Sequence, residues 1–409
     1  MKQSIKFHYK IPSIRFKLGK VIIKFLLISV MFSLLGLYFQ TEIYNFFEPK
    51  PFSGRYFYNP YQNWDKNKVV KANFHAHSKS WKGLTNGHNT EDEICNAYKK
   101  LGFGVAAVSN YHKIINKSDP QLIEIPTYEH GFNISKAHLL AINADETNFL
   151  DFPLFQGTSQ KQHKIYQLKQ SNAMVALAHP GLRNAYTKDD LRYMKGYTFM
   201  EVLSPYFKSF ELWDYALSLG NLSWLLANDD THDLKKQPPG KFFNLISTQS
   251  TSKGSLLNSL KNGTHLGYSS KNGIVDVFLD KIAVSNSEIY YSFSGKSPSV
   301  KAIIDGKPIK LPAKGKIELK EETKYVRFEV SGAKSTLFTN PVFRAKSATI
   351  EAGYGVQSVR ISKNKTINYR LKLAGISFLI ISSFFYNSIS SFLRNLKLLK
   401  NSKAKYSIR

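Results

Sequence analysis

Two histidines one residue apart, His75 and His77, stand at the end of an apolar run that begins at Val69. In a β-strand, residues i and i+2 point to the same side, so both imidazoles would leave one strand end together and could hold one metal ion. Further side chains with nitrogen or oxygen donors follow or open other short apolar runs: His112, Glu129, His138, His179, Asp230 and His232. We therefore expect these residues to gather in space as one metal site.

The donor types narrow the chemistry of that site. Imidazole and carboxylate ligands without thiolates suit zinc, manganese or iron, and so many ligands predict two or three divalent ions, with Glu129 able to bridge two of them. Cys95 is the only cysteine, which excludes a disulfide within the chain and a cysteine-based zinc site. The candidate catalytic residues are Asp230, His232 and Arg183. The arginine follows His179 closely and could bind a phosphate group or simply lie on the surface.

The elements that must position these residues alternate along residues 69–273. Strands are expected at residues 69–77, 103–109, 122–128, 138–144, 174–178, 199–204 and 222–228, and helices at residues 90–101, 159–170, 188–195, 210–219 and 253–261. This alternation favours parallel strands with right-handed crossovers. About seven or eight such units close most economically into a barrel, whose active site lies beyond the C-terminal strand ends. The candidate ligands fall at such ends, except His138, which opens its strand.

Residues 274–346 follow a different pattern. Short apolar strands separated by turn signals such as Asp305-Gly306 predict a small antiparallel β-sandwich. This part carries no cluster of titratable side chains. We therefore expect it to be a structural accessory to the barrel.

The two ends of the chain predict membrane anchoring. The net charge is +28, and basic residues precede an apolar run at residues 21–40 and follow another at residues 373–393. By the positive-inside rule both termini are cytoplasmic, at the cell membrane, and the barrel is extracytoplasmic. A cleaved signal peptide is the alternative for the first run, and a helix lying on the membrane is the alternative for the second. The lipid bilayer is an expected partner, whereas nucleic acid is not, because no recognised nucleic-acid motif accompanies the charge.

The predicted organisation has eight parts. They are a basic cytoplasmic tail (1–20), a transmembrane helix (21–40), a connector (41–68), the metal-dependent barrel (69–273), the β-sandwich (274–346), a second connector (347–372), a transmembrane or membrane-associated helix (373–393) and a basic cytoplasmic tail (394–409).

Six short motifs stand in a fixed order along residues 69–270. They are His75-Ala76-His77, Asn110-Tyr111-His112, Pro126-Thr127-Tyr128-Glu129, His138-Leu139-Leu140, His179-Pro180 and Asp230-Thr231-His232. This ordered set resembles the polymerase and histidinol phosphatase (PHP) family of metal-dependent phosphoesterases. The resemblance implies a distorted (β/α)7 barrel, a trinuclear metal centre and hydrolysis of a phosphate ester by a metal-activated hydroxide.

The chain departs from the family pattern at two places. The second motif lacks its usual aspartate, and the usual Ser-Asp-Gly appears as Thr85-Asn86-Gly87. Asn86 is a poor replacement for a ligand carboxylate, so the resemblance points to the neighbouring His88 as the substitute ligand.

Two other functions fit parts of the pattern. The departures would suit a non-catalytic binding module on a degenerate barrel. An amidohydrolase-type hydrolase also begins with two spaced histidines, but it typically uses a lysine on its fourth strand and a lone late aspartate. Glu129 and the pair Asp230 and His232 favour the phosphoesterase. The substrate is expected to be phosphorylated, without further definition.

Overall fold

The computed structural model describes residues 14–116, 119–285, 287–347 and 359–406. The chain divides into two compact units, one made from residues 1–43 with 362–409 and one from residues 44–361. The second unit contains every candidate ligand. Parts of both predicted basic tails, residues 1–13 and 407–409, lie outside the described residues.

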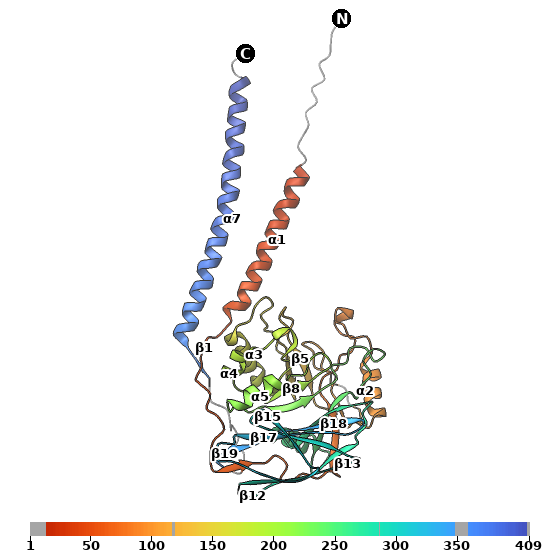
Figure 1. Ribbon diagram of the computed structural model, residues 1–409. Helices are drawn as coiled ribbons and strands as arrows, with labels where there is room; N and C mark the ends of the chain where they lie inside the picture. The colour runs from red at the N-terminus through yellow and green to blue at the C-terminus, as the bar shows by residue number, and fades with distance from the viewer. Residues whose placement is uncertain (1–13, 117–118, 286, 348–358, 407–409) are drawn as a thin grey trace. The chain divides into compact units, whose positions relative to one another are not determined.

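The first unit contains two long helices, α1 (Ile14–Phe39) and α7 (Lys363–Tyr406) (Figure 1). The segment Ile22–Phe39 has a mean hydropathy of 2.2 and is long and apolar enough to cross a membrane, a test that a signal sequence also passes. Helix α7 has 44 residues and extends beyond the predicted span 373–393 at both ends. No second helix among the described residues meets the same test of length and composition.

The second unit is a mixed α/β structure in which one sheet carries most of the ligand-bearing strands. This sheet has the order β5-β6-β7-β8-β9. Its strands are β5 (Thr127–His130), β6 (Leu139–Ile142), β7 (Met174–Leu177), β8 (Phe199–Leu203) and β9 (Trp224–Ala227), and all their residues are buried. Apolar runs buried on both faces require covering layers. Helices α3 (Thr158–Gln170), α4 (Lys188–Tyr193) and α5 (Phe210–Ser218) supply one, because α3 contacts β7 and α5 contacts β8.

A ten-stranded sheet carries the two spaced histidines. Its main order is β15-β14-β17-β18-β11-β10-β3-β4, with β19 and β2 paired beside β17. The strands are β2 (Tyr56–Tyr58), β3 (Val69–Asn73), β4 (Val105–Ala106), β10 (Phe242–Ser247), β11 (His265–Ser270), β14 (Ser299–Ile304), β15 (Lys307–Leu311), β17 (Tyr325–Ser331), β18 (Ser335–Thr339) and β19 (Val342–Ala345). Helices α2 (Glu91–Lys100) and α6 (Lys253–Lys261) complete this part.

The predicted all-parallel strand pairing is wrong for part of the unit. β6 runs antiparallel to both β5 and β7, and β10 runs antiparallel to β3. The connection between β5 and β6 contains no helix, and such short connections reverse the chain direction. β10 and β11 were not predicted as strands at all. The closed barrel is not confirmed, because the strands near the candidate ligands belong to two separate sheets among the described residues. Isolated parallel bridges, Ala76–Thr231 and Tyr111–Glu129, join these sheets.

The predicted accessory part forms two facing sheets. A three-stranded sheet of β12 (Val277–Ser285), β13 (Glu288–Gly295) and β16 (Lys314–Glu318) lies against the β14–β17 region (Figure 1). Tyr291 and Phe293 pack on Phe328 with ring centroids 5.2 and 5.3 Å apart. Because β18 pairs with β11, this part shares one continuous sheet with residues 69–273.

Most of the segment predicted as an irregular connector, residues 44–68 of 41–68, belongs to the same unit. β2 pairs with β19, and the buried Tyr61 donates its hydroxyl to the carbonyl of His265 at 2.9 Å. At the far end, β1 (Tyr44–Asn45) pairs with β20 (Arg360–Ile361). Residues 348–358 of the second connector lie outside the described residues.

Candidate metal centre

The ends of β3 and β9 bring the first ligands together. The backbone N–H of His77 donates to the carbonyl of Thr231 at 2.8 Å, so the segment after β3 runs alongside the segment after β9. Asp230 turns there with φ of 44°, a left-handed conformation that aspartate tolerates better than most residues. His179, just after β7, also has a positive φ of 29°. Uncommon backbone conformations of this kind gather at functional sites.

Two imidazoles and two carboxylates form the centre of the cluster. Nε2 of His75 lies 3.2 Å from Asp230 Oδ1 and 3.4 Å from Glu129 Oε2. Nε2 of His77 lies 3.1 Å from Glu129 Oε2 and 3.3 Å from Asp230 Oδ1. All four side chains are buried. The same two carboxylate oxygens are therefore shared by both imidazoles.

Three further imidazoles surround this centre. His138 Nδ1 lies 2.6 Å and His179 Nε2 lies 3.2 Å from Glu129 Oε1, and His232 Nε2 lies 3.3 Å from Asp230 Oδ1. Glu129 thus contacts imidazoles through both of its oxygens. It is placed to join two groups of ligands, as a bridging carboxylate would.

Opposite effects set the protonation of the cluster. Burial lowers the pKa of His75, but the charges of Asp230, Glu201 and Glu129 outweigh it and raise the pKa well above its usual value. Burial raises the pKa of Glu129, but His138 and His75 lower it well below its usual range. The pKa values of His77 and His179 are also raised, because carboxylate contacts outweigh burial.

The same atoms fit a divalent metal. Within the part of the chain that the structure describes, several buried atoms of the cluster have no hydrogen-bond partner: His75 Nε2, both ring nitrogens of His77, Glu129 Oε2, His138 Nε2, His179 Nδ1, Asp230 Oδ1 and His232 Nδ1. Buried polar atoms normally have a partner, so this concentration needs an explanation. Two groups could each hold an ion, His75 with Glu129 and His179, and His75 with His77 and Asp230.

The spacing of the donors supports the fit. Metal–ligand bonds of roughly 2.0–2.1 Å in a tetrahedral zinc site place the ligand atoms about 3.3 Å apart. The four contacts among His75, His77, Glu129 and Asp230 measure 3.1–3.4 Å. Nitrogen and carboxylate donors are also those that zinc, manganese and iron accept.

Glu201 belongs to the site but was not among the predicted residues. It is a fully buried carboxylate in the middle of β8, with Oε1 3.0 Å from Nδ1 of His75. Asn228 donates to the same oxygen at 2.9 Å, and the backbone N–H of His179 donates to Oε2 at 2.8 Å. Glu201 therefore orients two ligands at once, as carboxylates behind metal-bound histidines commonly do. A glutamate inside the otherwise apolar run Phe199–Leu203 was the signal in the sequence.

His112 does not join the cluster. Its Nε2 accepts from the backbone N–H of Gly131 at 2.9 Å, and its Nδ1 is 2.9 Å from the carbonyl of Asn148, to which it donates. Both ring nitrogens are thus bonded to the backbone. Tyr111, rather than His112, contacts the cluster, because its ring stacks on His77 at 4.7 Å and meets His138 edge-on at 5.6 Å. Burial, followed by the charge of Glu129, raises the pKa of the Tyr111 hydroxyl.

Two other predicted residues also lie apart. The His88 side chain is exposed, and only its backbone is tied to the site, through an N–H that donates to the carbonyl of His232 at 2.8 Å. Arg183 is exposed in a short 3-10 turn with φ of 52°. Neither residue is in the groups that could hold an ion.

A neighbouring carboxylate secures the loop that carries Asp230. Asp229 accepts hydrogen bonds from the backbone N–H groups of Gly240, Lys241 and Phe242 at 2.6, 2.9 and 2.8 Å. Burial raises the pKa of Asp229 to about 6, although these hydrogen bonds act to lower it. This side chain ties the end of β9 to the start of β10 and points away from the ligands.

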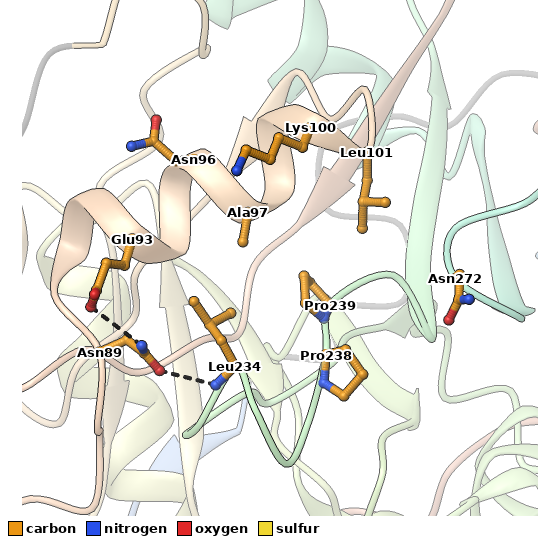
Figure 2. Close-up of a pocket in the computed structure, with 10 residues that line it drawn as sticks. All are labelled: Asn89, Glu93, Asn96, Ala97, Lys100, Leu101, Leu234, Pro238, Pro239 and Asn272. Atoms are coloured by element: carbon orange, nitrogen blue, oxygen red, sulfur yellow. Dashed lines mark hydrogen bonds between the residues drawn. The ribbon is translucent and has the colours of Figure 1, made fainter.

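One hollow of the unit lies apart from the cluster. An open hollow of about 750 Å³ lies between α2 and the loop containing Pro238 and Pro239 (Figure 2). At its edge, Asn89 accepts from the backbone N–H of Leu234 at 2.9 Å and donates to Glu93 at 3.3 Å. None of the ion-holding groups lines this hollow.

Comparison with known proteins gives only weak structural similarity. No protein-family model matches the chain, and no curated protein matches its sequence. The structure is similar to that of a two-domain protein from Bacteroides vulgatus that contains a predicted PHP-like metal-dependent phosphoesterase. The TM-score is 0.37 at 11% identity, over 74% of this chain and 99% of that one. Similarity at this level carries no argument about activity.

Proposed function

We propose that this chain is a membrane-anchored, metal-dependent phosphoesterase. One observation carries the proposal, the convergence of unpartnered buried nitrogen and oxygen atoms from His75, His77, Glu129, His179 and Asp230. The ordered motifs that resemble the PHP family support the same reaction class. Phosphate esters suit such a site because their hydrolysis needs an activated water and compensation of phosphoryl charge.

Each group of the chain has a proposed task. Glu129 joins the two ligand groups, and Glu201 holds the ring of His75 so that Nε2 faces the centre. A divalent metal, when bound, would supply Lewis acidity toward the phosphoryl oxygens and would lower the pKa of a water molecule, so that the nucleophile hydroxide forms near neutral pH. His232 is buried, and burial lowers its pKa, which favours the neutral imidazole that could act as a proton acceptor.

The outer part of the site is proposed to contact the substrate. Tyr206 is 42% exposed, and its ring centroid lies 6.4 Å from that of His232. Arg183, on the turn after His179, is the proposed cation for the phosphate group. Its replacement by methionine should raise KM and leave kcat nearly unchanged, because it would act in binding.

The proposed topology places both termini in the cytoplasm and residues 44–361 outside. The support is the apolar segment Ile22–Phe39 and the basic residues on its outer flank. Protease added to intact spheroplasts should digest the second unit and spare the chain ends. Protection of the whole chain would contradict this topology.

Metal content and hydrolysis test the central proposal together. The purified full chain should contain divalent metal and should hydrolyse at least one member of a panel of phosphomonoesters and phosphodiesters. His75→Ala and Asp230→Asn should lose both properties, whereas Asp233→Asn, at a carboxylate next to His232 but outside the cluster, should keep both. A metal-free wild type with the same background hydrolysis as His75→Ala would end the proposal. Metal and phosphate binding without turnover would favour the binding module instead.

A further inference from the structure

A set of exposed apolar side chains lies on the loops beside the metal cluster. These side chains, called here the apolar loop surface, are Trp81 (45% exposed), Leu84 (90%), Phe132 (52%), Ile134 (64%) and Phe149 (58%). They come from three separate loops, after β3, after β5 and after β6. Large apolar side chains are seldom left in water together unless something binds them.

Contacts between the loops show that the surface is continuous. The rings of Trp81 and Phe149 are 6.4 Å apart, and His112 lies between Phe149 at 5.7 Å and Phe132 at 5.3 Å. The backbone N–H of Ile134 donates to the carbonyl of Pro153 at 2.9 Å, which ties the second loop to the third. The surface is therefore one patch on a supported framework.

The surface borders the metal cluster through one residue. Nε1 of Trp81 donates to the carbonyl of Tyr111 at 2.7 Å, and the ring of Tyr111 stacks on His77 at 4.7 Å. His112, which lies under Phe149 and Phe132, is the next residue in the chain. The hydrogen bonds between both ring nitrogens of His112 and the backbone hold this ring in place, and the ring in turn supports the patch.

Lysines are the charged residues of most segments beside the patch. Lys79, Lys82 and Lys113 are exposed, and Lys136 is half-buried beside Ile134. The segments 78–90, 111–116 and 131–137 contain no aspartate or glutamate. The third loop does contain acids: Asp145 and Glu146, before Phe149, are exposed, whereas Asp151 is fully buried 3.1 Å from Lys164.

We propose that the apolar loop surface rests on a lipid bilayer that contains anionic phospholipids. Tryptophan and phenylalanine insert at the boundary between headgroups and acyl chains, and lysines beside them attract anionic headgroups. The segment Ile22–Phe39, long and apolar enough to cross a membrane, provides the reason for a bilayer to be nearby. The docking needs neither metal nor turnover, so it stands apart from the proposed hydrolysis.

The tryptophans of the chain allow a direct test. Trp213 is fully buried, Trp224 is 2% exposed and Trp64 is half-buried, so Trp81 is the tryptophan that can meet lipid. The full chain is placed in nanodiscs of phosphatidylcholine with phosphatidylglycerol, with or without acyl chains brominated near the headgroup. Brominated lipid should quench the part of the wild-type fluorescence that comes from Trp81, which is the part missing in Trp81→Phe. The fluorescence of Trp81→Phe itself should be the same with and without bromine.

Other outcomes would overturn the proposal. Equal quenching of wild type and Trp81→Phe would show that Trp81 does not reach lipid. Trp81 quenched by acrylamide but not by bromine would face water. Trp81 quenched by neither would be covered by protein, either a second copy of the chain or another partner.

One single variant and two double variants separate the apolar and electrostatic contributions to docking. Leu84→Asp should lower bromine quenching while leaving the tryptophan itself in place. Lys82→Glu with Lys113→Glu should reduce quenching in anionic discs to the level seen in phosphatidylcholine alone. The matched control, Lys253→Glu with Lys334→Glu, reverses two exposed lysines elsewhere on the unit and should behave as wild type. Equal loss in both lysine pairs would contradict local docking.

Discussion

Two groups of histidines in the same unit have opposite surroundings. His75 and His77 contact carboxylates, which raise their pKa values against the effect of burial. His112 and His265 contact backbone carbonyls instead, and burial lowers their pKa values. All four side chains are buried, so burial does not separate ligand from structural histidine. The partner of each ring nitrogen does.

The imidazoles of the cluster do not all behave alike. Burial lowers the pKa values of His138 and His232, although each has one close carboxylate. His179 also has one close carboxylate, yet its pKa is raised against the effect of burial, because Glu129 acts on it together with the charges of Asp230 and Glu201. His75 has three close carboxylates, Glu129, Glu201 and Asp230, and its pKa is raised well above its usual value.

Replacing one histidine of each group with alanine should give the largest difference between the two groups. His77→Ala should lose bound metal, because it removes a ligand from one of the two groups. His112→Ala should keep the metal and lower the free energy of unfolding by about 1–3 kcal/mol, because Gly131 and Asn148 lose a hydrogen-bond partner. Metal analysis and thermal unfolding measure the two effects. Loss of metal in both variants would place His112 among the ligands.

Replacing Glu201 by glutamine tests the carboxylate behind His75. The amide keeps the shape but lacks the charge, so metal affinity should fall by roughly 10–100-fold with little change in fold. Titration with a competing chelator measures the affinity. An unchanged affinity would reduce Glu201 to a packing role.

Acid should destabilise the protein through the histidines bonded to backbone. Burial lowers the pKa of His265 to about 4, below the 6.5 of an unfolded chain. Its contribution to stability is therefore present above pH 6.5 and is lost as the pH falls toward 4, by about 3 kcal/mol over that window. Unfolding of wild type and His265→Gln at pH 7 and pH 4.5 measures this. Parallel losses in the two proteins would show that His265 does not contribute.

The sequence predicted the local elements better than their pairing. The predicted helix 90–101 forms as α2, which begins at a capping box of Thr90 and Glu93, and the predicted helix 253–261 has the bounds of α6. Local hydrogen bonds and helical periodicity decide such features. The directions of β6 and β10 depend on the path that the connecting segments take between strands. A short sequence pattern does not predict that path.

The sequence predicted which segments meet at the cluster better than which residue of a segment faces it. His75, His77, Glu129, His179 and Asp230 come together as expected. The second motif was read with His112 as the ligand, but a shift of one residue turns a side chain to the opposite face, and Tyr111 faces the cluster. Glu201 was overlooked because a single acid in an apolar strand has no spacing pattern of its own.

The ladder between β1 and β20 has a consequence for how this protein is organised. Tyr44 pairs with Ile361 and Asn45 with Arg360, so the polypeptide enters and leaves residues 44–361 at adjacent points. A module whose two ends meet can be inserted into a surface loop of an unrelated host without stretching either chain. Inserted in that way, residues 44–361 would carry every residue of the candidate metal centre with them.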